Sequence, residues 1–224
     1  MSQNFWTASS PEQVDLRALA SRMGVSLDTI PFSARILAEN ILRQALHLAP
    51  TGAVPEATWD DLRAVLTRGS GDRQRGIALG VSRVILPDSS GVPVLQNLAG
   101  LRDVVARQGG DVRAISPFVP LDVIVDHSLQ VDFSGVPDAL MRNLTREYER
   151  NAERYSFLKW AQGAFGNVTI HPPGSGIIHQ INLERLARVM VRASSATGPI
   201  IHPEFVLGGD SHTPMGNALG VLGW

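Results

Sequence analysis

The chain contains no cysteine among its 224 residues. Without thiolates it can form no disulfide bond, and by itself it can hold neither a thiolate-bound zinc ion nor an iron–sulfur cluster. Long apolar runs are also missing, since no stretch approaches the roughly 20 residues that cross a bilayer. The first residues, MSQNFWTASSPEQ, lack the basic and apolar regions of a secretion signal. These absences predict a cytoplasmic protein.

An excess of either charge is missing as well. The formal net charge is −1, so no overall positive field would attract a phosphate backbone, and we expect neither a nucleic acid nor a membrane as a partner. Hydrophobic residues make up 44% of the chain and charged residues 18%, which is typical of a folded globular protein. The length suffices for one large domain or two small ones.

Apolar residues recur at helical and at strand spacings along the chain. Helices are predicted over residues 33–48, 59–67, 95–105 and 138–165, with a short one within residues 1–28 and another after Asn182. Strands are predicted over residues 81–86, 121–125, 168–171 and 205–207, and residues 88–93 resemble a turn. Residues 142–154 are predicted as a solvated helix face. Strands that alternate with helices favour an α/β fold with some parallel pairing.

Chemically active side chains follow predicted strands or a glycine-rich loop at three places. These residues are Asp126 and His127, then His179, then Asp210, Ser211 and His212. Ligands bind at the carboxyl ends of strands in open α/β sheets, so we expect the three places to converge on one pocket. An imidazole beside a carboxylate is suited to acid–base work on a small molecule.

Other interpretations of these residues are weaker. Any single Asp-His pair is more often a turn with a structural hydrogen bond than a catalytic couple. A metal site made of His127, His179 and His212 is conceivable, but the long spacing matches no compact ligand pattern. His171 and His202 both precede proline in extended segments, and neither is assigned a role.

Five phrases of the chain together resemble the aconitase superfamily, and specifically the cytosolic aconitase and iron-regulatory branch. They read IPFSARILAENILR, SRVILPDSSGVPVLQNLAGLRD, SPFVPLDVIVDHSLQVD, FLKWAQGAFGNVTIHPPGSGIIHQINLE and LGGDSHTPMGNALGVLGW. The motifs DHS, PGSGIIHQ and GDSHT in this order are highly specific. The resemblance implies a three-layer α/β/α domain with a mixed, partly parallel sheet, incomplete at the C-terminus. Residues 29–224 would form this part of the domain, and residues 1–28 an N-terminal extension.

The resemblance also implies a hydro-lyase that dehydrates and rehydrates a hydroxy di- or tricarboxylate, an isomerisation of the kind found among tricarboxylic acids. Family members bind a four-iron–four-sulfur cluster whose exposed iron acts as a Lewis acid on the substrate. By motif, Asp126 and His127 match the acid–base pair that assists departure of the hydroxyl, and His179 matches a histidine that orders the proton network. Asp210 and His212 match residues that position the hydroxyl. Asp88, Ser128 and Ser211 are the implied substrate contacts.

Two departures from the family pattern affect this expectation. Where the family carries glutamine followed by aspartate, this chain has Pro87 and Asp88, so the preferred acid is expected to differ from citrate. The cluster cysteines, the substrate-binding arginines and the proton-abstracting serine of the family lie beyond the position that matches Trp224. The chain holds no metal ligands, so we expect a hydro-lyase part that needs a cysteine-bearing partner or continuation. The alternative is a noncatalytic lobe that binds a polycarboxylate or a partner protein.

Overall fold

A computed structural model describes residues 5–7, 12–48, 54–67, 75–125, 130–173, 186–195 and 198–224. These residues belong to two compact units. The first comprises Met1–Val81 and Arg188–Phe205, and the second comprises Ser82–Ala187 and Val206–Trp224. Within the described residues, no helix combines the length and the apolarity needed to cross a membrane.

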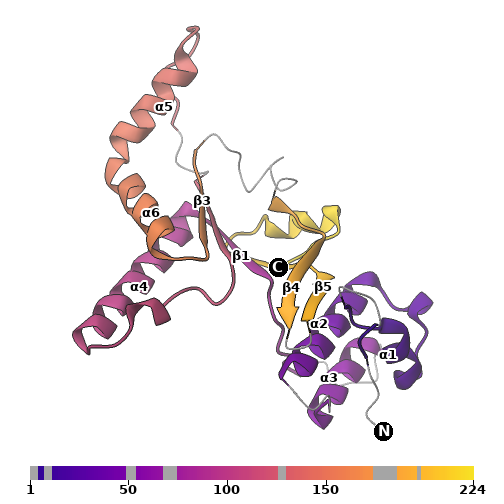
Figure 1. Ribbon diagram of the computed structural model, residues 1–224. Helices are drawn as coiled ribbons and strands as arrows, with labels where there is room; N and C mark the ends of the chain where they lie inside the picture. The colour runs from indigo at the N-terminus through magenta and orange to yellow at the C-terminus, as the bar shows by residue number, and fades with distance from the viewer. Residues whose placement is uncertain are drawn as a thin grey trace. The chain divides into compact units, whose positions relative to one another are not determined.

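Within its described residues, the first unit contains α-helices and a β-hairpin (Figure 1). The helices are α1 (Leu16–Met23), α2 (Phe32–Leu48) and α3 (Glu56–Leu66), with a short 3-10 helix, η1 (Leu27–Thr29), between the first two. Strands β4 (Met190–Ser195) and β5 (Gly198–Pro203) pair antiparallel. The core is formed by apolar side chains at helical spacing, including Leu19, Leu42 and Leu62, each at most 1% exposed. The helices predicted over residues 33–48 and 59–67 are therefore confirmed.

The second unit is built around a five-stranded sheet. Its strands are β1 (Arg83–Pro87), β2 (Leu121–Ile124), β3 (Val168–His171), β6 (Phe205–Gly208) and β7 (Leu222–Gly223). Their order in the sheet is β3-β2-β1-β6-β7, and the pairs β1·β2, β2·β3 and β1·β6 are parallel. This mostly parallel sheet with helices in its connections confirms the predicted α/β class.

Helices α4 (Asp88–Arg107) and α6 (Ala152–Ala164) cover one face of this sheet, and α5 (Ala139–Arg150) extends from α6 away from the strands (Figure 1). The covered face buries Leu95 of α4 and Leu158 of α6 against Val123 of β2. On the other face, Ile85, Ile124 and Val206 form a smaller cluster with Val221. Two 3-10 helices, η2 (Val112–Ala114) and η3 (Thr213–Leu219), complete the unit.

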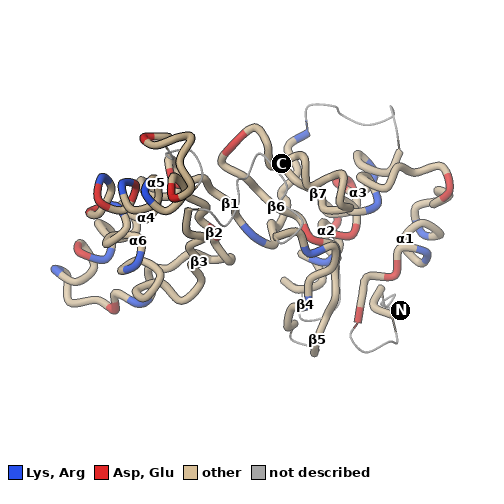
Figure 2. The backbone as a smooth tube through the Cα atoms, turned by 90° about the horizontal axis from the view of Figure 1, so that it is seen from above, with Lys and Arg blue, Asp and Glu red and all other residues tan. Residues whose placement is uncertain are grey.

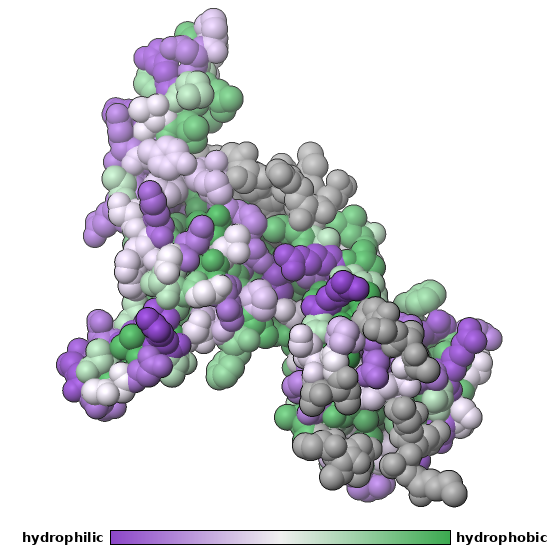
Figure 3. All heavy atoms as spheres, viewed as in Figure 1, coloured by the Kyte–Doolittle hydropathy of each residue, from purple (hydrophilic) through white to green (hydrophobic). Residues whose placement is uncertain are grey.

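Three sequence predictions about the helices were wrong. The helix predicted after Asn182 was expected to include Met190, which instead begins β4, and residues 182–185 lie outside the described residues. The predicted turn over residues 88–93 is the first part of α4, which begins at Asp88 and contains Pro93. The predicted single helix over residues 138–165 is two helices, α5 and α6, which meet at Asn151. Acidic and basic positions are interspersed around α4, α5 and α6 (Figure 2), and in the view of Figure 3 the outer part of α5 carries hydrophobic residues on one side and hydrophilic residues on the other.

Candidate active site

The order of the strands reverses between β1 and β6. Along the chain, the sheet grows from β1 through β2 to β3 in one direction, whereas β6 is added on the opposite side of β1. Because these strands are parallel, their carboxyl ends lie on the same edge of the sheet. A reversal of strand order opens a crevice at that edge, and open α/β sheets bind ligands there.

The first turn of α4, which directly follows β1, meets the loop after β6 at this reversal. The Gly209 amide donates to the carbonyl oxygen of Ile85 at 3.0 Å. A Cβ placed on Gly209 would lie 2.5 Å from Cδ2 of Leu86 and 2.9 Å from Oγ of Ser90. The absence of a side chain at Gly209 therefore brings the loop that carries Asp210 against the first turn of α4.

Asp210, Ser211 and His212 form a turn held by the aspartate. The hydroxyl of Thr213 donates to Oδ1 of Asp210 at 2.6 Å, and the backbone N–H of His212 donates to Oδ2 at 3.3 Å. Nδ1 of His212 lies 3.3 Å from the same Oδ2, and the Ser211 hydroxyl lies 3.4 Å from Nδ1. Asp210 is mostly buried, while the His212 side chain is 42% exposed. An oriented imidazole with an open side can exchange protons with a ligand.

Asp88 is buried at the start of α4 and is paired with a distant helix. Its Oδ2 lies 2.8 Å from Nη1 of Arg154, and Nη2 of Arg154 lies 2.7 Å from Oε1 of Glu147. The Tyr155 hydroxyl donates to the same Oε1 at 2.7 Å. Burial, together with the bond to the Glu147 carboxylate, raises the pKa of the Tyr155 hydroxyl. This network ties the β1–α4 turn to α5 and α6.

The network also corrects a sequence prediction. Residues 142–154 were predicted as a solvated helix face, but the Glu147 side chain is 2% exposed and that of Arg154 is 22% exposed. The partner of Arg154, Asp88, lies 66 positions away in the chain. The predicted contact of Asp88 with a substrate stays a prediction, and the structure gives its carboxylate a structural partner.

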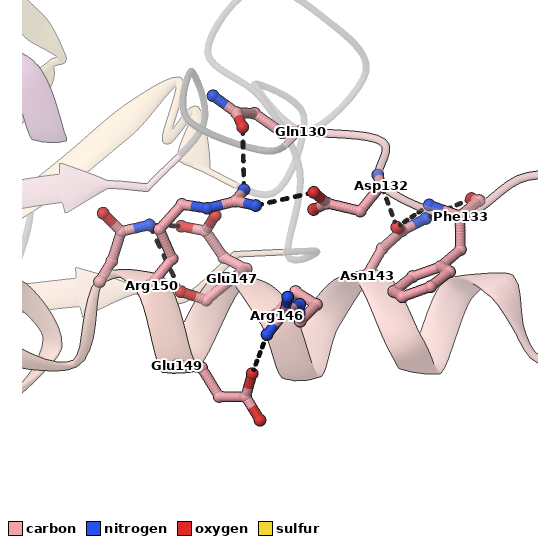
Figure 4. Close-up of polar contacts among 9 residues, drawn as sticks. Gln130, Asp132, Phe133, Asn143, Arg146, Glu147, Glu149 and Arg150 are labelled. Carbon is pink, nitrogen blue, oxygen red and sulfur yellow. Dashed lines mark hydrogen bonds and ion pairs between the residues drawn. The ribbon is translucent and has the colours of Figure 1, made fainter.

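A second set of polar contacts connects residues 130–133 to α5 (Figure 4). Arg150 donates to Oε1 of Gln130 at 2.9 Å and to Oδ1 of Asp132 at 2.7 Å. The Asn143 side chain accepts from the backbone N–H groups of Asp132 and Phe133, and donates to the Phe133 carbonyl oxygen. On the other side, the Val125 amide donates to the His171 carbonyl oxygen at 3.0 Å. The hydrogen bonds of Val125 and of residues 130–133 therefore lie on either side of residues 126–129 in the sequence.

Four of the predicted site residues lie outside the described part of the chain. They are Asp126, His127, Ser128 and His179. The structure does place the element before the first three, since Val125 directly follows β2, whose last residue pairs with Pro87 of β1. The first turn of α4, after β1, and the loop after β6 are brought together. The convergence of His127, His179 and His212 stays a prediction.

A buried charged group that sequence reasoning missed lies within the sheet. Nε2 of His171 is 2.8 Å from Oδ1 of Asp122, and Nη1 of Arg83 is 3.2 Å from Oδ2. Burial raises the pKa of Asp122, but the bond from His171 and the charge of Arg83 outweigh it, so the net pKa is lowered. The available signal was a charged residue inside each of two otherwise apolar predicted strands.

The residues present do not fit an iron–sulfur cluster as its ligands. The chain has no cysteine, and among the residues whose placement is described no three His, Asp or Glu side chains group as a metal site. A cluster of the kind implied by the family is held by thiolates. Any such cluster would therefore need ligands from outside this chain.

Comparison with known proteins identifies the family. Residues 57–224 match the profile of the Aconitase family (aconitate hydratase). The chain is 44% identical over 201 residues to phosphinomethylmalate isomerase of Streptomyces viridochromogenes, an alignment that covers 89% of this chain and 22% of that protein. It is 40% identical to aconitate hydratase A of Thermus thermophilus and 41% identical to that of Staphylococcus epidermidis, each over 210 residues, which cover 94% of this chain and 22% of each relative.

The chain thus spans about a fifth of the length of these relatives. The family match extends over three quarters of the chain and includes every strand of the five-stranded sheet and each described residue of the candidate site. The chain belongs to the aconitase family.

Proposed function

We propose that this chain supplies the N-terminal part of an aconitase-type hydro-lyase. It acts on a hydroxy di- or tricarboxylate, from which water is removed to form an alkene acid and to which water is added back. The observation that carries this proposal is the meeting of the Asp210 turn and the first turn of α4 at the reversal of strand order, in a chain of this family. Activity requires a cysteine-bearing segment, on the same or a second polypeptide.

Side chains at the carboxyl edge of the sheet carry out the proton transfers that accompany the loss and addition of water. His212 and Asp210 act together, with Nδ1 of His212 3.3 Å from Oδ2 of Asp210, and Ser211 contacts the substrate. Asp126 and His127 follow β2 and protonate the departing hydroxyl, and His179 orders the proton network. Ser128 and Asp88 are proposed as further substrate contacts. Asp88 would contact the substrate while it remains paired with Arg154.

The substrate is proposed to differ from citrate. Pro87 occupies the last position of β1 and has no side-chain donor, so it cannot bind a substrate oxygen as glutamine would. One similar protein is named phosphinomethylmalate isomerase. A malate-type acid with a phosphinomethyl substituent therefore belongs in any substrate panel, beside citrate, isocitrate and malate-type acids without phosphorus.

The test is assembly with a cysteine-bearing aconitase segment. The chain would be produced alone and together with that segment, loaded anaerobically with iron and sulfide, and assayed with the panel by absorbance of the alkene product. We expect turnover of at least one acid by the assembled protein and none by the chain alone. Loaded protein that turns over no acid, together with calorimetric binding of an acid by the chain alone, would instead support the noncatalytic lobe.

A further inference from the structure

His171 lies at the edge of the sheet where the site residues gather. It is the last residue of β3 and pairs with Ile124, the last residue of β2, which in turn pairs with Pro87, the last residue of β1. The segments that leave these three positions therefore start from one row across the carboxyl edge. The Asp210 loop leaves the same edge after Gly208, whose partner on β1 is Ile85.

The imidazole of His171 is oriented by a buried carboxylate. Oδ1 of Asp122 lies 2.8 Å from Nε2, and Oδ2 is paired with Arg83 at 3.2 Å. Because Asp122 is ionised beside Arg83, its oxygens can only accept, and Nε2 of His171 must carry the proton. Nδ1 is the nitrogen that remains for another partner, and it makes no hydrogen bond with any residue that the structure describes.

The charges around His171 leave it suited to an anion. Asp122 of β2 and Arg83 of β1 are the charged groups of the described residues that face it, and they neutralise each other. Arg83 also donates to the carbonyl oxygen of Leu186, which fixes the guanidinium in place. Protonation of His171 therefore adds a net positive charge at the sheet edge. The side chain is 27% exposed, so a ligand can reach it.

We propose that His171 is an additional substrate-binding residue of this site, which donates a hydrogen bond from Nδ1–H of its imidazolium to an anionic oxygen of the substrate. Asp122 acts as its positioning residue. This inference rests on the proposed function for the class of ligand, a polycarboxylate or an acid with one phosphinate group. A purely structural role is the competing explanation, in which the pair only joins β2 to β3.

The kinetic test uses His171→Gln in the assembled enzyme. The glutamine amide can still donate to Asp122 but cannot become a cation. We expect KM to rise about tenfold or more at pH 6, because a hydrogen bond to a charged group is lost, with little change in kcat. The control is His47→Gln, the same change at an exposed position of α2.

A second readout does not depend on turnover. In protein labelled with nitrogen-15, titration with each acid of the panel in turn should, for at least one acid, shift the imidazole resonances of His171 and leave those of His47 unchanged. His171 resonances that stay unchanged at millimolar concentrations of every acid in the panel would overturn the proposal, as would a His171→Gln variant that melts earlier but keeps the wild-type KM. An assembled protein without turnover would count against the proposed hydro-lyase, and the titrations with the panel of acids would still decide the role of His171.

Discussion

Asp122 is the residue whose ionisation contributes most clearly to folding. Its pKa is lowered in the folded chain by His171 and Arg83, despite burial. A carboxylate with a depressed pKa stabilises the fold above its unfolded pKa of about 3.9, and this contribution is lost as pH falls through the folded pKa. We therefore expect the free energy of unfolding to drop steeply below about pH 4.

The variant Asp122→Asn tests this expectation at the same residue. It removes one partner of a buried ion pair, which costs about 3 kcal/mol at pH 7. Urea unfolding between pH 3 and pH 7 should show a large loss at neutral pH and a shallower acid dependence than in the wild type. Asp138→Asn is the control, since the Asp138 side chain is 65% exposed and its pair with Arg142 contributes at most about 1 kcal/mol. Parallel pH profiles for the wild type and Asp122→Asn would contradict this account.

Gly208 is required by the packing of the Asp210 turn. A Cβ at this position would lie 2.3 Å from Cβ of Thr213, the residue whose hydroxyl holds Asp210. Gly208→Ala should therefore lower the free energy of unfolding by about 1–3 kcal/mol, through overpacking. Gly163→Ala is the control, because no atom lies within 4 Å of its added Cβ in α6 and alanine should stabilise the helix by about 0.5–1 kcal/mol. Equal effects of the two changes would refute the packing argument.

At the scale of elements, α5 is expected to hold the segment that follows residues 126–129. Asn143→Ala removes the acceptor for the amides of Asp132 and Phe133. One hydrogen bond contributes about 1 kcal/mol, so hydrogen exchange at these amides should accelerate about fivefold to tenfold. Arg146→Ala, which removes only a half-exposed pair with Glu149 on the same helix, should leave both rates unchanged. Equal exchange rates in the two variants would show that the hydrogen bonds of Asn143 do not protect the amides of Asp132 and Phe133.

Four strands of the five-stranded sheet were predicted, whereas β7, the hairpin of β4 and β5, and the helix boundaries were not. Short β-branched and apolar runs at residues 121–125 and 168–171 predicted β2 and β3 closely. The residues DSSG at positions 88–91 favour a turn but also suit the first turn of a helix, and here they begin α4. Gly91 is needed inside that helix because a Cβ would lie 2.6 Å from Val123 of β2. Such a tertiary requirement leaves no periodic signal in the sequence.

Only the part of the candidate site that is formed by residues close together in the sequence could be predicted. The motif around Asp210 is local, so its residues could be identified from one phrase of the sequence. The pairs Asp88–Arg154 and Asp122–His171 join residues 66 and 49 positions apart, and neither spacing carries a recognisable pattern. From the sequence alone, Arg154 therefore could not be distinguished from a solvent-exposed arginine.

At the scale of the whole molecule, the chain combines the turn of Asp210 and His212 at the edge of a mostly parallel sheet with a complete lack of cysteine. It spans about a fifth of the length of its aconitate hydratase and isomerase relatives. These facts support an account in which the acid–base groups lie in this chain and the cluster ligands lie elsewhere. The central claim is that the loop after β6 takes part in the removal of water from the substrate.

The rate of alkene formation by the assembled protein, compared between the wild type and Asp210→Asn, tests this claim most directly. An essential acid–base group contributes about 10²–10⁴-fold to the rate, so the variant should lose at least about 100-fold in kcat. Asp103→Asn, at an exposed position of α4, should retain full activity. An active assembled protein whose rate is unaffected by Asp210→Asn would contradict the account.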